Sequence, residues 1–150
     1  MTDEGQTYKP EDLDYLVIDL DSAEELSTLP TGTEATLQIN EVFPDPARFN
    51  IRIRCSILGA ELTKDITHFL YFPKRPRDGQ PGDDPKKTNN KILMIRNFCK
   101  AVGIASGDWS FYASNPRSLI GLTFNAILKE TSSSQYGKQN EVDRLQLPSA

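Results

Sequence analysis

Cysteine, histidine and tryptophan are scarce in this chain of 150 residues, which contains two, one and one of them. Two cysteines cannot form a disulfide framework, and Cys55 and Cys99 lack the CxxC or Cys/His spacing of a structural zinc site. The single histidine, His68, lies in a predicted strand, where a packed side chain is more common than a general base. No P-loop, nucleophile elbow or metal-ligand set is present. We therefore expect no enzyme, no cofactor and no metal.

Long hydrophobic runs are also missing. A membrane-spanning helix needs about 18 or more consecutive apolar residues, and no run approaches that length. The first residues are acidic, whereas a secretory signal begins with basic residues followed by an apolar stretch. We expect a soluble cytoplasmic protein without a membrane partner, with one domain large enough to bury a core without disulfides.

Acidic and basic residues are divided unevenly along the chain, although the net charge is only −4. Residues 1–47 contain twelve acids and one base, a charge of −11, and residues 48–150 contain sixteen bases and nine acids, a charge of +7. Such asymmetry indicates an acidic tail or a nucleic-acid partner, although the charges could simply pair across a folded surface. We expect residues 1–28 to form an acidic, partly flexible arm and residues 29–150 to form the binding domain.

Five segments have the composition and alternation of half-buried strands. They are residues 33–43, 48–57, 65–72, 118–129 and 141–147. In the first, Ala35, Leu37, Ile39 and Phe43 share the apolar face. In the second, Phe49, Ile51, Ile53, Cys55 and Ile57 do so. The polar residues 130–140 read as a hairpin loop, and residues 73–90 read as a long exposed loop without periodicity.

One helix is predicted between the third and fourth strands. Thr88 or Asn89 can cap its start, and Gly103 can cap its end after Val102. The apolar residues at helical spacing are Ile92, Ile95, Phe98, Cys99 and Val102. This order predicts a mostly β protein with one helix, an OB-fold in the form of a five-stranded Greek-key barrel, although other α+β folds share the order.

Basic and aromatic side chains alternate with the apolar residues in the predicted strands. Arg52 and Arg54 lie roughly 7 Å apart on one face of a strand, close to the phosphate spacing of an extended single strand. Phe69 and Tyr71 share a face of the next strand, with burial in the core as the alternative, mainly for Phe69. Binding of single-stranded nucleic acid needs basic side chains that neutralise phosphates and aromatic rings that stack on nucleobases.

Further candidates lie in the loop after the third strand and in the last hairpin. The expected nucleic-acid-binding residues are Arg52, Arg54, Phe69, Tyr71, Lys74, Arg75, Arg77, Lys129, Tyr136 and Lys138. For the loop bases the alternative is a solvated loop, and for the hairpin tip it is ordinary turn composition. In OB-folds, however, the loop between strands four and five commonly contacts the nucleic acid.

Four short motifs resemble a group of phage-encoded OB-fold proteins. They are Leu29-Pro30-x-Gly32, the helix at residues 90–103, Leu119-Ile120-Gly121, and Tyr136-Gly137-Lys138-x-Asn140-x-Val142. The resemblance covers residues 29–147 and implies a single-stranded-DNA-binding protein of phage replication or recombination, acting in the host cytoplasm. Two features depart from that pattern: the neutral Ser132-Ser133-Ser134, and an acidic arm at the N-terminal instead of the C-terminal end.

The arm has two expected roles. It could cover the basic groove when DNA is absent, in which case deletion of residues 1–28 tightens binding at low salt, or it could recruit replication or recombination proteins. A rival function is a protein–protein or phage structural module, in which residues 15–20 add a strand to a neighbour's sheet and make a homo-oligomer. Carbohydrate binding by the same barrel is a third, weaker alternative.

Overall fold

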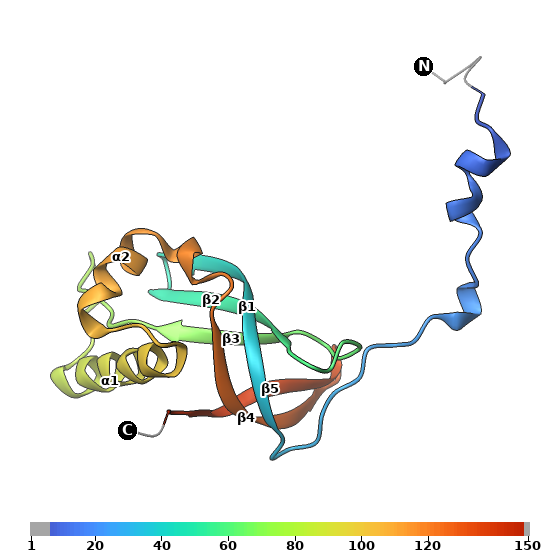
Figure 1. The fold of residues 1–150 in the computed structure, drawn as a ribbon. Helices are drawn as coiled ribbons and strands as arrows, with labels where there is room; N and C mark the ends of the chain where they lie inside the picture. Colours follow the sequence, from blue (N-terminus) through green and yellow to red (C-terminus); the bar gives the residue numbers. More distant parts are fainter. Residues whose placement is uncertain (1–6, 149–150) are drawn as a thin grey trace.

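Five antiparallel strands form one open sheet in the computed structural model, which describes residues 7–148 (Figure 1). The strands are β1 (Glu34–Asp45), β2 (Asn50–Ile57), β3 (Ile66–Tyr71), β4 (Thr123–Ser133) and β5 (Gly137–Gln146). Their order across the sheet is β3-β2-β1-β4-β5. The two edge strands, β3 and β5, contact each other without forming a ladder in the described part of the chain. The prediction of a mostly β protein with five strands is confirmed.

Two helices lie at one end of the sheet, between β3 and β4 in the chain (Figure 1). They are α1 (Pro85–Val102) and α2 (Trp109–Ser114). Within the described residues, five short 3₁₀ helices complete the fold: η1 (Pro10–Asp12), η2 (Asp14–Leu16), η3 (Leu20–Ser22), η4 (Ser106–Asp108) and η5 (Pro116–Leu119). No helix of residues 7–148 has both the length and the apolarity that crossing a membrane requires.

The prediction of a single helix is wrong because of α2. Six residues are too few for a helical period to show in the sequence, and so short a helix is stabilised by packing more than by propensity. Trp109 stacks on Phe72 with 6.0 Å between ring centroids, and on Tyr112 at 6.4 Å. These rings cover the core beside α1.

Helix α1 begins earlier than predicted. Asp84, and not Thr88 or Asn89, is the N-cap, and its carboxylate accepts a hydrogen bond of 2.7 Å from the N–H of Lys87. Proline at the first helical position has no N–H to leave unpaired, so Asp84-Pro85 is a favourable start. The C-terminal prediction is confirmed, since Gly103 has a φ of 83° and caps the helix.

The core lies between the sheet and α1. Every second residue of β2, from Ile51 to Ile57, is buried as predicted. Phe98 from α1 meets Phe124 from β4 edge to face, with centroids 5.7 Å apart. Both cysteines are buried, and burial, with the nearby charge of Asp65, raises the pKa of Cys55 to about 12. Neither thiol is therefore an accessible nucleophile.

A β-bulge interrupts β1 at Asn40. Ile39 pairs with Cys55 and Glu41 with Arg54, which leaves Asn40 as an extra residue. The bulge reverses the alternation, so that Val42 is buried and Phe43 lies on the opposite face from Ile39. The prediction that Phe43 shares the inner face of Ile39 is therefore wrong.

The last hairpin is longer than predicted. The ladder between β4 and β5 continues to the pair Ser133–Gly137, through residues 130–140 that read as a loop in the sequence. This end of the hairpin is a polar ribbon with almost no buried side chain. Such a ribbon has no apolar face, and period-two hydrophobicity cannot reveal it.

The arm joins the folded body at Ser27. The N–H of Ser27 donates to Leu62 and its carbonyl accepts from Lys64, both at 2.9 Å. The buried side chain of Asn140 accepts a hydrogen bond from the N–H of Leu29 and donates one to the carbonyl of Leu29, both at 2.8 Å. The part of the arm before Leu26 extends away from the body (Figure 1), whereas Leu26 itself lies against the body beside β3 and β5.

Candidate nucleic-acid interface

Two exposed aromatic rings of β3 lie on the face of the sheet that points away from the core. Phe69 and Tyr71 stack with 5.7 Å between centroids and 15° between planes. They are 39 % and 48 % exposed, so neither is part of the core. We use the name outer face for this ring pair together with Phe43, Arg52 and Arg54 of the adjacent strands.

Arg52 lies between aromatic rings of two neighbouring strands. It pairs in register with Phe43 of β1 and with Phe69 of β3. Its guanidinium carbon is 4.5 Å from the centroid of the Phe43 ring, a cation–π contact between neighbouring strands. The neighbouring Arg54 forms an ion pair of 3.5 Å with Glu41. Arg52 forms no ion pair with an acidic side chain in the described part of the chain.

The opposite side of β3 faces inward. Ile66 and Leu70 are buried, and His68 between them is half-buried with its ring 6.3 Å from that of Phe124. Burial lowers the pKa of His68 because a charged imidazole loses solvation there. This histidine is a packed residue of the strand. Because His68 and Leu70 share the inward side, the intervening Phe69 and the following Tyr71 point outward.

His68 should make stability depend on pH. Its pKa in the folded chain is below the ordinary value of 6.5, so the unfolded chain binds the proton first. The stabilisation by the neutral ring is complete above about pH 6.5 and is lost as pH falls through the folded-state pKa. We expect the free energy of unfolding, measured in urea between about pH 7.5 and 5.5, to decrease on acidification, and less so in His68→Gln. An equal decrease in both proteins would contradict this assignment.

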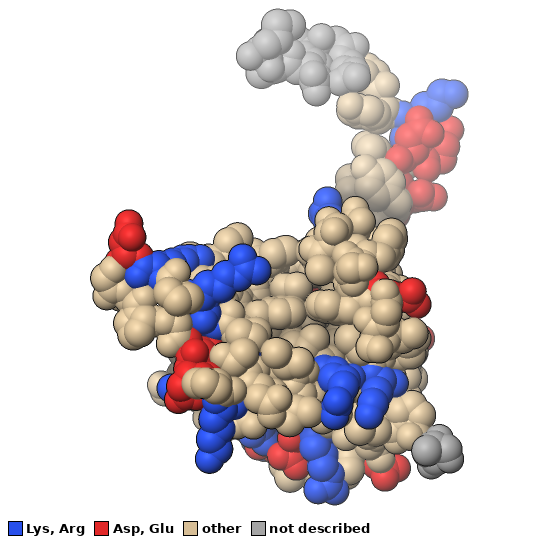
Figure 2. Space-filling model, turned by 90° about the vertical axis from the view of Figure 1, so that its left-hand side faces the viewer, with Lys and Arg blue, Asp and Glu red and all other residues tan. Residues whose placement is uncertain are grey.

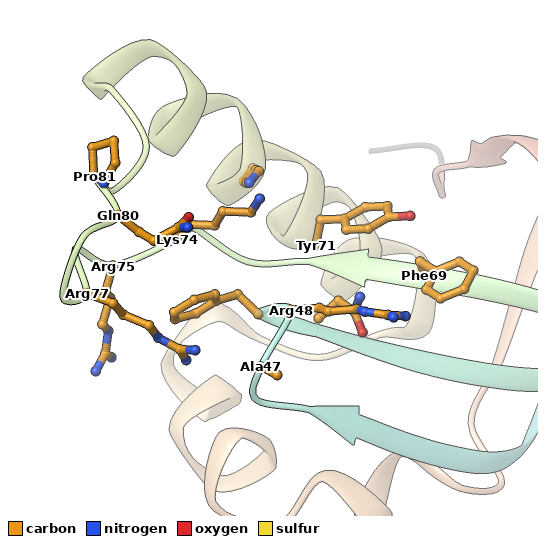
Figure 3. Close-up of a pocket in the computed structure, with 12 residues that line it drawn as sticks. Ala47, Arg48, Phe69, Tyr71, Lys74, Arg75, Arg77, Gln80 and Pro81 are labelled. Atoms are coloured by element: carbon orange, nitrogen blue, oxygen red, sulfur yellow. The ribbon is translucent and has the colours of Figure 1, made fainter.

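A first groove, of about 760 Å³, runs beside the ring pair (Figure 3). Its walls come from the outer face, the turn between β1 and β2, and the loop between β3 and α1. The lining residues are Ala47, Arg48, Phe49, Asn50, Phe69, Tyr71, Lys74, Arg75, Arg77, Gln80, Pro81 and Lys91. Figure 3 shows Arg48 extending from the turn toward Phe69, and Arg75 and Arg77 lying at the far end of the groove. Basic side chains thus lie at both ends of an aromatic surface.

The loop that supplies three of these bases is folded back on itself. Asp83 accepts hydrogen bonds from the N–H of Lys74 at 3.0 Å and from the Lys91 ammonium at 2.6 Å, which together lower its pKa. Arg77 and Gln80 exchange two backbone hydrogen bonds, of 3.0 and 2.8 Å. The loop read as unstructured therefore has its own hydrogen bonds, which the sequence did not reveal because they join single residues without periodicity. Lys74 and Arg75 have no ion-pair partner among residues 7–148.

The turn between β1 and β2 supports the loop through Arg77. The guanidinium of Arg77 donates to the carbonyl of Pro46 at 2.8 Å and lies 4.1 Å from the centroid of Phe49. Phe49 has a φ of +54°, a strained value for a bulky residue. The expectation that Phe49 continues the buried face of β2 is thus wrong, because the turn reverses its direction.

A second groove, of about 730 Å³, lies on the other side of the ring pair, between β3 and β5. Arg54 and Lys64 contribute basic side chains to it, and Asp65 and Glu141 contribute acidic ones, so its lining has no excess of positive charge. Phe69 and Tyr71 line both grooves and form the wall between them. The two grooves and the ring pair therefore make one continuous path across the open side of the sheet.

The three expected hairpin residues line neither groove. Lys129 forms an ion pair with Glu141 at 3.8 Å, and Lys138 approaches Glu130 to 4.0 Å. Tyr136 is exposed at the turn. The ammonium of Lys64 donates to the carbonyl of Lys138 at 2.7 Å, which places the hairpin tip beside the second groove.

Sequence reasoning missed four residues of the interface, namely Phe43, Arg48, Phe49 and Lys64. Phe43 and Phe49 were assigned to the core by strict alternation, and only the bulge and the turn move them outward. Arg48 was placed on the polar face of its strand, but not in the site. No local signal identifies Lys64, because it is brought to the hairpin by tertiary contact.

In the described part of the chain, no three side chains of His, Cys, Asp or Glu gather to hold a metal ion. Comparison with protein-family models, with curated proteins and with solved structures finds no match for this chain. We therefore base the function on the geometry of the outer face and its two grooves.

Proposed function

We propose that this protein binds single-stranded DNA without sequence preference and without catalysis. The observation that carries the proposal is the stacked, exposed pair Phe69–Tyr71 beside a groove that several basic and no acidic side chains of the described residues line. Aromatic rings stack on any nucleobase, and basic side chains neutralise the phosphates between them. A duplex keeps its bases stacked inside, so the ring pair favours single strands.

An OB-fold is the architecture that we propose for the sheet. OB-folds are partly open five-stranded Greek-key barrels that bind oligonucleotides on the face of strands two and three and through the loops between strands 1–2 and 4–5. The open sheet order, with the helices between β3 and β4, supports this assignment. Arg52 and the ring pair lie on β2 and β3, and Arg48 and Tyr136 lie in the two corresponding loops.

The path of the bound DNA strand follows from the positions of the basic side chains. Arg48, Lys74 and Arg75 would contact phosphates in the first groove, and Arg54 and Lys64 would do so in the second. The ring pair between the grooves would hold one or two nucleobases. Tyr136 and Lys138 at the hairpin tip would close over the strand that leaves the second groove. From the resemblance of residues 29–147 to phage proteins, we further propose that this binding serves DNA replication or recombination.

A fluorescence titration across a salt series tests the function. We expect an unlabelled chain to bind a labelled oligothymidylate much more tightly than a duplex of the same length. The logarithm of affinity should fall with the logarithm of salt by about 0.7 for each phosphate neutralised. The groove residues Lys64, Lys74 and Arg75, which form no ion pair among residues 7–148, therefore predict a slope of about −2 or steeper. No binding at about 50 mM salt would contradict the proposal and favour the protein–protein module.

Matched variants distinguish the effect of the site residues on binding from the effect of the net charge of the protein. Lys74→Ala/Arg75→Ala removes two basic side chains of the first groove and should make the slope shallower by about 1.4. Lys86→Ala/Lys87→Ala removes the same charge from the exposed start of α1, which lines neither groove, and should leave the slope almost unchanged. Equal effects of the two variants would mean that the grooves do not guide the strand.

A further inference from the structure

We infer that residues 14–22 of the arm dock in an apolar groove beside α1 of a second copy of this chain. The interaction links copies head to tail and is independent of DNA, so it goes beyond the proposed function. Three observations carry it: the exposed apolar side chains of the arm, an apolar groove with a basic rim, and the position of the arm on the body.

The arm exposes an unusual density of apolar side chains. Tyr15, Leu16, Val17, Ile18 and Leu20 are each between 60 % and 85 % exposed. The two 3₁₀ helices η2 and η3 flank the extended residue Val17, and none of the three packs on the body. A contiguous apolar patch that polar residues border marks an interaction site.

The groove that fits this segment lies between α1 and α2 and has a volume of about 500 Å³. Its lining is mostly apolar and includes Ile95, Ile104 and Trp109. Ile92 also lines it and is 52 % exposed, although its helical spacing predicted a place in the core. The apolar face of α1 is therefore wider than the sheet covers, and part of it remains open.

Charge is complementary between the two surfaces. Arg96 and Lys100, one helical turn apart on α1, line the groove, and no acidic side chain of the described residues does so. In the arm, Asp14, Asp19 and Asp21 flank the apolar side chains. None of these acids forms an ion pair with a base among residues 7–148. Figure 2, which looks onto the helix end, shows basic side chains spread over it and the acidic arm behind.

The attachment of the arm favours a second copy over the same copy. Ser27 and Leu29 are hydrogen-bonded to the body beside β5 and the entry to β3. From there the arm leaves on the side opposite the helices (Figure 1). An arm that points away from its own groove can reach the groove of a neighbour. The contact joins two different surfaces, so copies can exchange arms in a pair, close into a ring or continue as a chain.

Sedimentation velocity of the full chain at low salt and without DNA tests this linkage. The arm variant is Val17→Ser/Ile18→Ser, and the groove variant is Arg96→Glu/Lys100→Glu, both at exposed or groove-lining positions outside the sheet. We expect the average mass of the parent chain to rise with concentration. Each variant should associate at least about tenfold more weakly, because one surface loses its apolar contacts or opposes like charges.

Mixing the two variants gives the decisive result. The arm variant retains its groove and the groove variant retains its arm, so a mixture can form one intact contact and should give pairs and nothing larger. The matched control Lys86→Glu/Lys87→Glu makes the same charge change on α1 outside the groove and should associate like the parent chain.

Three outcomes would overturn the inference. A parent chain that stays monomeric as concentration rises would show that the arm docks on its own copy or nowhere. Association that the arm variant loses and the groove variant keeps would place the arm on another surface, such as a sheet edge. Association that both variants keep would exclude the arm. Because no DNA is present, none of these outcomes depends on the proposed single-strand binding.

Discussion

The double variant Phe69→Ala/Tyr71→Ala is expected to bind single-stranded DNA about 10²- to 10³-fold more weakly than the parent chain. Stacking of a nucleobase on an aromatic ring contributes about 1–3 kcal/mol, so two rings contribute about 4 kcal/mol together. Both side chains lie on the surface, and their loss should change the free energy of unfolding little. No charge is removed, so the salt slope of the fluorescence titration should stay the same.

A control variant removes an aromatic ring elsewhere. Phe111 in α2 is exposed to a similar degree and lines none of the grooves beside the ring pair. Phe111→Ala should bind like the parent chain, and Tyr71→Phe, which keeps the ring, should lose little. If the double variant bound as tightly as Phe111→Ala, the ring pair would have no part in binding.

Phe98→Ala is expected to lower the free energy of unfolding by about 3–5 kcal/mol, a large share of the about 5–15 kcal/mol of a typical domain. Phe98 is 1 % exposed and meets Phe124 edge to face, so its removal leaves a cavity between α1 and the sheet. Urea unfolding followed by circular dichroism measures the change.

Met94→Ala is the matched control on the same helix. Met94 is largely exposed, and its truncation should change stability by only about 0.5 kcal/mol or less. Similar losses in the two variants would mean that Phe98 is not the residue that fixes α1 on the sheet.

The regular alternation of polar and apolar residues is the feature of the fold that could be predicted from the sequence. The polar and apolar residues of β2 alternate without interruption, and the structure buries Ile51, Ile53 and Cys55 in that order. Alternation also placed Phe69 and Tyr71 on one face of their strand, but it left burial in the core open, and only the structure shows both rings exposed. The end of α1 was predictable because Gly103 can adopt a positive φ at little cost.

Elements determined by pairing between distant residues were not predictable. Nothing in the sequence around Asn40 signals a bulge, since the extra residue is defined only by the partners on β2. The bulge also affects the candidate site, because it brings the ring of Phe43 into contact with the guanidinium of Arg52. Phe49 was missed for a related reason: its strained φ and its contact with Arg77 exist only when the loop folds against the turn.

The hydrogen bonds of Ser27 and Leu29 also determine where a mechanical load on the arm would act. A pull on the arm enters the body through Leu62, Lys64 and Asn140, and therefore through β5 and the entry to β3. These hydrogen bonds share the force, so β1 does not separate from β2 and β4 one hydrogen bond at a time. The arm can be stretched while β1 keeps its register with β2, and with it the geometry of the outer face.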